Sequence, residues 1–271
     1  MRHRRGLAIL IAAALGLAAP AAFAQSLAPA PAISAREAAD QKIVMAVLAS
    51  GSLQAMVPHI AELRDVLEHA PASYPRIEQR GDLVIIRDED VPATANLALL
   101  LGAAAQRRSL TVRREFNTYG NAAMLLASIA NEGNLPQAAL TITEHWLKLQ
   151  PDNPKLVNEK IAALEIMHRP VEALSAADQW LTTVKIAADA DRARMLRAKG
   201  YALTELKRLD EAEAAYQDSL KLQPGHQGAL NELIYIARQK QGQAPTSSVM
   251  TTSDKAVTGA YQTPQPPPPK P

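Results

Sequence analysis

The chain has 271 residues, of which 29 are Lys or Arg and 27 are Asp or Glu, giving a formal net charge of +2. It contains no cysteine, which excludes disulfides, thiol catalysis and lipid attachment at a cysteine. So small a charge gives no strong attraction to nucleic acid or to an anionic membrane, and we expect neither as a partner.

The first 24 residues have the pattern of a secretory signal peptide. Three arginines precede the uncharged apolar stretch Leu7–Ala19, and small residues follow at Ala22 and Ala24. This pattern predicts cleavage between Ala24 and Gln25 and a periplasmic or secreted protein with no stable membrane span. An uncleaved N-terminal anchor is the alternative. Removing the three leader arginines leaves 26 basic residues against 27 acidic ones.

A short linker, 25–33, leads to an N-terminal helical region that we place at 34–118. Two amphipathic helices are expected there, at Ser34–Ala49 and Ser52–His69. The second has an apolar stripe at helical spacing, made of Leu53, Met56, Val57, Ile60, Leu63 and Leu67.

The end of this region, 71–118, reads as a small α/β insert. Arg80-Gly81-Asp82 is a turn signal between a strand at Arg76–Gln79 and a strand at Leu83–Arg87. A buried helix is expected at Ala93–Arg107 and a further strand at Leu110–Arg114. The insert matches no motif, and we regard it as a candidate for a family-specific functional site.

From residue 119 the chain repeats itself. The pentapeptide Leu-Lys-Leu-Gln-Pro occurs at Leu147–Pro151 and at Leu220–Pro224, and each copy is expected at the end of a helix. We divide the region into unit one (119–153), unit two (154–188), unit three (189–225) and a C-terminal capping helix (226–242).

Unit three has the clearest pattern. A helix starting at Asp191 carries an apolar stripe through Leu206, and Asp210 with Glu213 reads as a capping box for the next helix. The stripe and the residues after it resemble the tetratricopeptide repeat (TPR) family. The match is carried by Leu196, Gly200, Leu203, Ala212, Tyr216 and Pro224. The resemblance implies an all-α, TPR-like solenoid of helix pairs.

Units one and two match more loosely. Unit one has helices at about Asn121–Glu132 and Pro136–Leu149, with its turn at Gly133 and its stop at Pro151. Unit two begins at Pro154. Its small contact residue is Ala173, and we assign the corresponding role in unit one to Ala138. Ala138 and Ala212 are then 74 residues apart, which implies one extra residue in unit one, because the pentapeptides are 73 apart. In unit one, we assign to Leu126 the position at which the TPR pattern has glycine.

The last helix, Gln227–Gln241, should shield the end of the array through a stripe of Leu230, Leu233, Ile234 and Ala237. Beyond it, residues 243–271 are rich in Pro and polar residues, which predicts a disordered tail. Its polyproline end is either a spacer or a PxxP-type ligand.

No constellation for catalysis, a cofactor or a metal ion is apparent, so we expect no enzyme, no cofactor and no metal site. No two mature histidines are three or four residues apart. Glu165 and His168 share a helix face, but a surface pair or a turn contact accounts for them. Trp146 and Trp180 are expected in the core, with ligand stacking as the alternative.

The resemblance implies that partners lie in a groove formed by the first helices of each pair. Its polar, mostly cationic residues suit an acidic peptide or a chain carboxylate. These residues are Lys155, Asn158, Arg194, Arg197, Tyr201, Glu205, Asn231, Tyr235 and Arg238. Unit one contributes only Ala123 and Ala127 to this groove.

The sequence thus predicts a non-catalytic scaffold that binds a protein or peptide in the bacterial cell envelope. A self-associating assembly factor for an envelope or polysaccharide machine is the alternative.

Overall fold

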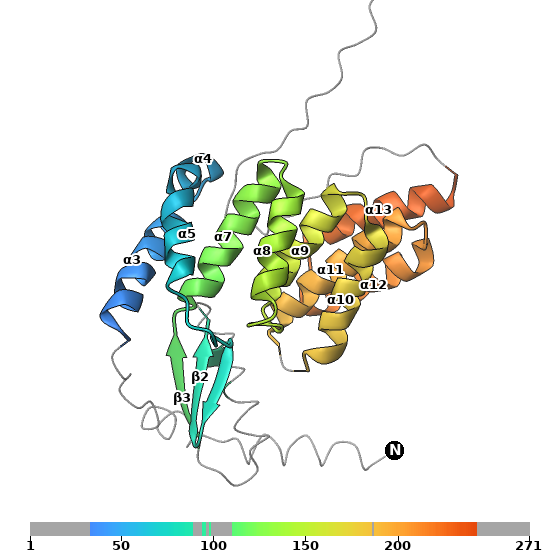
Figure 1. The fold of residues 1–271 in the computed structure, drawn as a ribbon. Helices are drawn as coiled ribbons and strands as arrows, with labels where there is room; N and C mark the ends of the chain where they lie inside the picture. The colour runs from blue at the N-terminus through green and yellow to red at the C-terminus, as the bar shows by residue number, and fades with distance from the viewer. Residues whose placement is uncertain (1–32, 89–93, 96–97, 99–109, 186, 243–271) are drawn as a thin grey trace, which may run out of the picture.

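The computed structural model describes residues 33–88, 94–95, 98, 110–185 and 187–242. These residues are mostly helical, with a small three-stranded sheet at one end of the helical array (Figure 1). The predicted leader, most of the linker and the predicted tail lie outside the described residues. Of the predicted helix Ala93–Arg107, only residues 94, 95 and 98 are described, and all three are helical.

The two N-terminal helices predicted from the sequence are present, but the second is interrupted. Helix α3 (Ala35–Ala49) begins where the Ser34 side chain accepts a hydrogen bond from the Glu37 amide. Pro58 has no amide hydrogen to continue a helical ladder, and the second segment therefore divides into three pieces. These are α4 (Leu53–Met56), the 3₁₀ helix η1 (Val57–His59) and α5 (Ile60–Glu68).

The break changes which side chains face the core. Val57, a predicted stripe residue, is 45% exposed, whereas Val66 is fully buried. Leu63 stays in the core as expected. The buried side chains of α3 and α5 pack against α7 (Thr118–Glu132), where Tyr119 and Leu126 complete a shared core.

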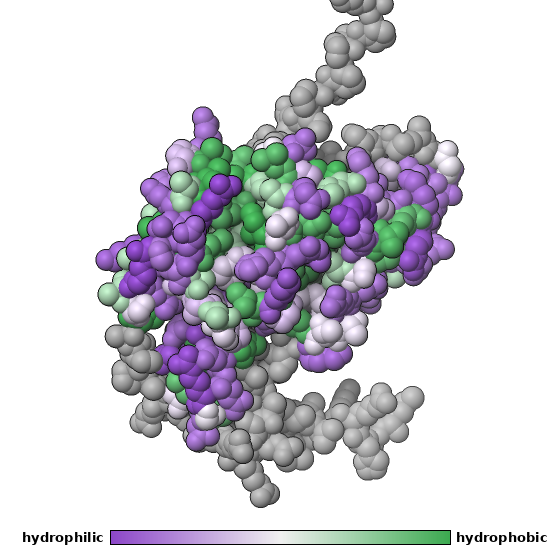
Figure 2. All heavy atoms as spheres, in the orientation of Figure 1, coloured by the Kyte–Doolittle hydropathy of each residue, from purple (hydrophilic) through white to green (hydrophobic). Residues whose placement is uncertain are grey.

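The sheet consists of β1 (Ile77–Arg80), β2 (Leu83–Arg87) and β3 (Thr111–Glu115) in that order. β1 and β2 pair antiparallel around a two-residue turn in which Gly81 adopts φ of 61°. β2 and β3 pair parallel, so the chain crosses over between them. In Figure 2 the sheet's visible surface is mainly hydrophilic, whereas Val84, Ile86 and Val112 form a small buried cluster.

Three helix pairs and a final helix follow the sheet, and each pair packs on the next. After α7 the helices are α8 (Pro136–Trp146), α9 (Pro154–Ile166), α10 (Pro170–Thr183), α11 (Asp189–Glu205), α12 (Leu209–Leu222) and α13 (Gln227–Lys240).

The turns inside the three pairs have the same geometry. Asn134, His168 and Lys207 each adopt a positive φ, between 54° and 59°. In each turn, the amide of the following residue donates a hydrogen bond to the carbonyl of the residue five positions earlier. These bonds are 2.8, 2.8 and 2.9 Å long, and each satisfies a carbonyl at the end of the first helix that has no partner within that helix. These residues are 34 and 39 positions apart, so the structure contains a true repeat with unequal spacing.

This repeat corrects the predicted register. Ala138 is exposed, and its neighbour Ala139 is the fully buried contact residue. Ala139, Ala173 and Ala212 are again 34 and 39 residues apart, which makes 73, the separation of the pentapeptides. The predicted extra residue in unit one is therefore wrong. The glycine position falls on buried Ala127 rather than on Leu126.

Gly200 and Tyr216 pack closely against each other in unit three. A Cβ atom on Gly200 would lie 2.8 Å from the Tyr216 ring, so only glycine lets the two helices approach this far. Leu203 is fully buried beside them, but predicted Leu196 is only half-buried. Met195 occupies the core in its place.

Other predicted boundaries also shift. Helix α8 ends at Trp146, so the first pentapeptide forms a turn, whereas the second ends helix α12 at Leu222 before Pro224. Helix α11 starts at Asp189, not Asp191. The capping box at Asp210 and Glu213 is wrong. Both side chains lie inside α12 and hold Lys240 of α13 instead.

The final helix buries a different face from the predicted stripe. Ala229, Glu232 and Ile236 are buried, and Leu233 packs against the same core. Leu230 and Ile234 are 37% and 53% exposed. The last helix therefore keeps an apolar outer edge, made of two residues of the predicted stripe. Trp146 and Trp180 are buried as expected.

Candidate functional site

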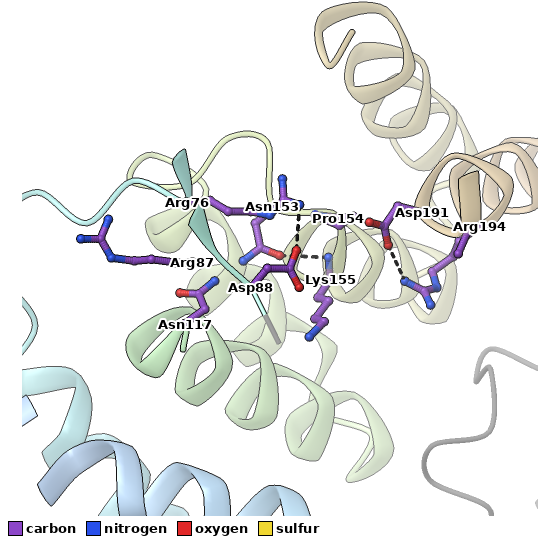
Figure 3. A pocket seen from close by; sticks show the side chains of 10 residues that line it. Arg76, Arg87, Asp88, Asn117, Asn153, Pro154, Lys155, Asp191 and Arg194 are labelled. Carbon is purple, nitrogen blue, oxygen red and sulfur yellow. Dashed lines mark hydrogen bonds and ion pairs between the residues drawn. The ribbon is translucent and has the colours of Figure 1, made fainter. Parts of the chain in front are cut away.

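A pocket of about 330 Å³ lies where the sheet meets the first helices of units two and three. Figure 3 shows side chains from β2, from the loop before β1 and from the starts of α9 and α11 around it. It joins the insert to two residues of the predicted groove. Its lining comprises Arg76, Arg87, Asp88, Asn117, Asn153, Pro154, Lys155, Ala190, Asp191 and Arg194.

Arg76 forms the link between the insert and the helical array. Its guanidinium is buried and donates to Asp88 at 2.9 Å and to Asp152 at 3.1 Å. Burial alone would lower the pKa of Arg76, but Asp152 and Asp88 raise it above its usual value. The arginine thus remains charged while its two carboxylate partners fix the position of the sheet.

Arg87 lines the pocket on the side of the sheet and is held by its neighbours. It donates to the Pro75 carbonyl at 2.7 Å and to Glu78 at 2.8 Å. Its guanidinium carbon also lies 4.4 Å from the centroid of the Tyr74 ring, within cation–π range. These contacts make Arg87 a rigid part of the wall.

The opposite side of the pocket is built from two helix starts. The Asn153 side chain accepts from the Lys155 and Leu156 amides and so caps α9. In α11, Arg194 donates to Asp191 at 3.2 Å. Burial raises the pKa of Asp191, although Arg194 opposes that effect. Both helix dipoles present their positive ends here, which favours an anionic group.

A buried amide network supports the floor of the pocket. Gln150, which is fully buried, exchanges two hydrogen bonds with Asn117, each 3.0 Å long. It also donates to the Tyr74 carbonyl at 2.9 Å and accepts from Asn153 at 2.7 Å. This glutamine of the first pentapeptide therefore positions the cap of α9.

The predicted groove residues do not all meet at the pocket. Only Lys155 and Arg194 line it. Arg197 donates to Gln223 at 2.8 Å, and Asn158 and Tyr201 are half-buried farther along their helices. We call the side of α9, α11 and α13 that bears the nine predicted residues the first-helix face. Its other members, Glu205, Asn231, Tyr235 and Arg238, are exposed or half-buried. Ala123 and Ala127 are fully buried, so they do not belong to it.

The far end of this face is acidic, whereas the sequence predicts a mostly cationic groove. Both carboxylate oxygens of Glu165 are inaccessible to solvent and accept no hydrogen bond from any described residue. Burial, and then the charge of Glu205, raise the pKa of Glu165 to about 8. Burial and then Glu165, Glu205 and Glu232 likewise raise the pKa of Tyr201. These three carboxylates come from three different helices.

Most of the other pocket residues carry no local sequence signal. Arg76 and Asp152 are 76 positions apart, so no motif could connect them. Beyond the predicted groove residues, the capping residue Asn153, followed by proline, was recognisable in principle as a helix start.

Within the described segments, no group of three or more His, Asp or Glu side chains is arranged to hold a metal ion. None of the described helices has the length and hydropathy needed to cross a membrane. No protein-family model, curated protein or solved structure matches this chain.

Proposed function

We propose that the chain is a non-catalytic, TPR-like scaffold that binds a protein or peptide in the cell envelope. The observation that carries this proposal is the pocket between the sheet and the starts of α9 and α11. Lys155 and Arg194, together with two positive helix ends, suit a carboxylate of a bound segment. The regular turns at Asn134, His168 and Lys207 support the repeat architecture that such scaffolds use.

The test is a charge reversal at the pocket, Lys155→Glu together with Arg194→Glu. We expect this variant to lose capture of the native partner in a crosslinking pull-down from the envelope, with little change in helical content. Lys221→Glu, on the exposed side of α12, is the matched control. Capture that survives the double reversal would show that the pocket is the wrong site. Arg197→Glu serves as an additional probe, although Arg197 also supports Gln223.

Export is part of the same proposal and rests on the leader pattern of residues 1–24. Recovery of a mature N-terminus at Gln25 from the native envelope is the expected result. A protein that retains its first 24 residues would contradict it.

A second function, self-association as an assembly factor, is favoured by one observation. Leu230 and Ile234 leave an apolar edge on the last helix, where another repeat would otherwise pack. Light scattering should then show a mass that rises with concentration, and Ile234→Glu should return the protein to a monomer. A monomer at every concentration would exclude this function.

A further inference from the structure

The first-helix face changes charge along the helices that form it. Lys155 and Arg194 lie near the starts of α9 and α11, beside the sheet. Glu165 and Glu205 lie at the ends of the same two helices. The two helices therefore give the face a basic end at the pocket and an acidic end near the turns.

The acidic end has features of a cation site. Glu205 is exposed, and the half-buried Tyr201 lies one helical turn before it on α11. The Glu165 carboxylate is buried with no hydrogen-bond donor among the described residues, which is a costly arrangement for a charged group. Exposed Glu205 can pair directly with a cation of a bound segment, and that cation would also offset the effect of Glu205 on the buried Glu165.

The two ends are separated by a defined distance. Arg194 and Glu205 are eleven residues apart in one continuous helix, which corresponds to about 16 Å at 1.5 Å per residue. An extended polypeptide rises about 3.3 Å per residue, so about five residues span the same distance.

We propose that this face binds an extended polypeptide segment with an acidic group at the pocket and, about five residues away, a lysine or arginine paired with Glu205. This inference rests on the proposed scaffold function and specifies the chemistry of its partner. Charge complementarity at both ends also fixes the direction in which the segment lies on the helices.

The experiment selects a displayed library of random ten-residue peptides on the mature protein. We expect enriched peptides to pair an acidic residue with a basic one four to six positions away. In Glu205→Lys, the basic preference should disappear and the best peptide should bind at least tenfold more weakly, while the acidic preference remains. Glu205→Gln, which keeps the shape of the side chain, should weaken binding in the same direction. Asp218→Lys, on the exposed side of α12, should change nothing.

The possible failures can be told apart. If Glu205→Lys enriches the same basic residues as the parent protein, the inference is overturned. The scaffold function still stands in that case, provided that Lys155→Glu with Arg194→Glu removes the acidic preference. If that pocket variant also enriches the same peptides as the parent, both proposals are wrong. Circular dichroism of each variant establishes that the helices are intact.

Discussion

The two copies of Leu-Lys-Leu-Gln-Pro have the same sequence but different structural roles. In unit one the pentapeptide follows the end of α8, and Gln150 is fully buried at the centre of an amide network with the insert. In unit three the pentapeptide completes α12, and Gln223 is half-buried and accepts one hydrogen bond from Arg197. The difference comes from the neighbours: the first pentapeptide lies against the insert, whereas Gln223 of the second is bonded to Arg197 of the neighbouring helix α11. Repetition of a sequence therefore fixes the position of a residue in a repeat, but not its energetic importance.

The largest effect is expected where Arg76 joins the insert to Asp152 of unit one. Arg76→Ala leaves Asp88 and Asp152 without their buried cation and should lower the free energy of unfolding by about 3–5 kcal/mol. The measurement is urea unfolding followed by circular dichroism. Lys199→Ala removes the half-exposed ion pair between Lys199 of unit three and Asp178 of unit two and should cost less than about 1 kcal/mol. Equal losses would mean that the insert contributes little to stability.

The two glutamines provide the most direct test of the comparison. Gln150→Ala should lower the free energy of unfolding by about 2–3 kcal/mol, because buried polar groups of Asn117, Asn153 and Tyr74 lose their hydrogen-bond partner. Gln223→Ala should cost less than about 0.5 kcal/mol, since Arg197 keeps access to water. Thermal melts of both variants would reveal the difference, and a comparable loss in the two would remove the distinction between the copies.

Packing inside unit three should also be tighter than in unit one. Gly200→Ala forces its new methyl group into the Tyr216 ring and should cost about 1–2 kcal/mol, despite the better helix propensity of alanine. The equivalent position of unit one is already Ala127, which is fully buried. A double variant, Gly200→Ala with Tyr216→Leu, should recover part of the loss in denaturant unfolding. No recovery would mean that another contact limits the helix approach.

Glu165 of unit two allows a test in which the substitution should raise the stability of the protein instead of lowering it. Because the pKa of Glu165 is about 8 in the fold and about 4.5 in an unfolded chain, the folded state holds a proton that the unfolded state releases between these values. Stability from this group is complete below pH 4.5 and is lost as pH rises through 8. Glu165→Gln should therefore stabilise the protein at pH 8 and leave its stability unchanged at pH 4. Unfolding curves at the two pH values that shift equally would show that Glu165 is not the buried acid described here.

Much of the helical array could be predicted because its boundaries depend on local chemistry. Pro136, Pro154 and Pro170 each stand at the first position of a helix, where the missing amide hydrogen costs nothing. The register of unit one could not be fixed in the same way. Ala138 and Ala139 are identical in type, and only the packed structure distinguishes the exposed one from the buried one.

The candidate site could be predicted only in part, since its residues come together through packing. Lys155 and Arg194 were identifiable from their places in the repeat, and both line the pocket. Arg76 and Asp88 were not, because the insert matches no motif and its docking position depends on contacts with Asp152. The sequence predicts a surface pair or a turn contact for Glu165, since a single acidic residue in an amphipathic pattern gives no indication that both of its oxygens are covered.

The hydrogen bond from Gln150 to the Tyr74 carbonyl has a consequence for the order of folding. It joins residues 76 positions apart, and the ion pair between Arg76 and Asp152 spans the same separation. Contacts so distant in sequence carry a large loop-closure cost, whereas each helix pair of the array forms through local contacts. A chain synthesised from its N-terminus onward therefore cannot dock its sheet against the helices until Asp152 has been synthesised and α8 has formed. We expect the helix pairs to fold early and the insert to be the last element to acquire its native position.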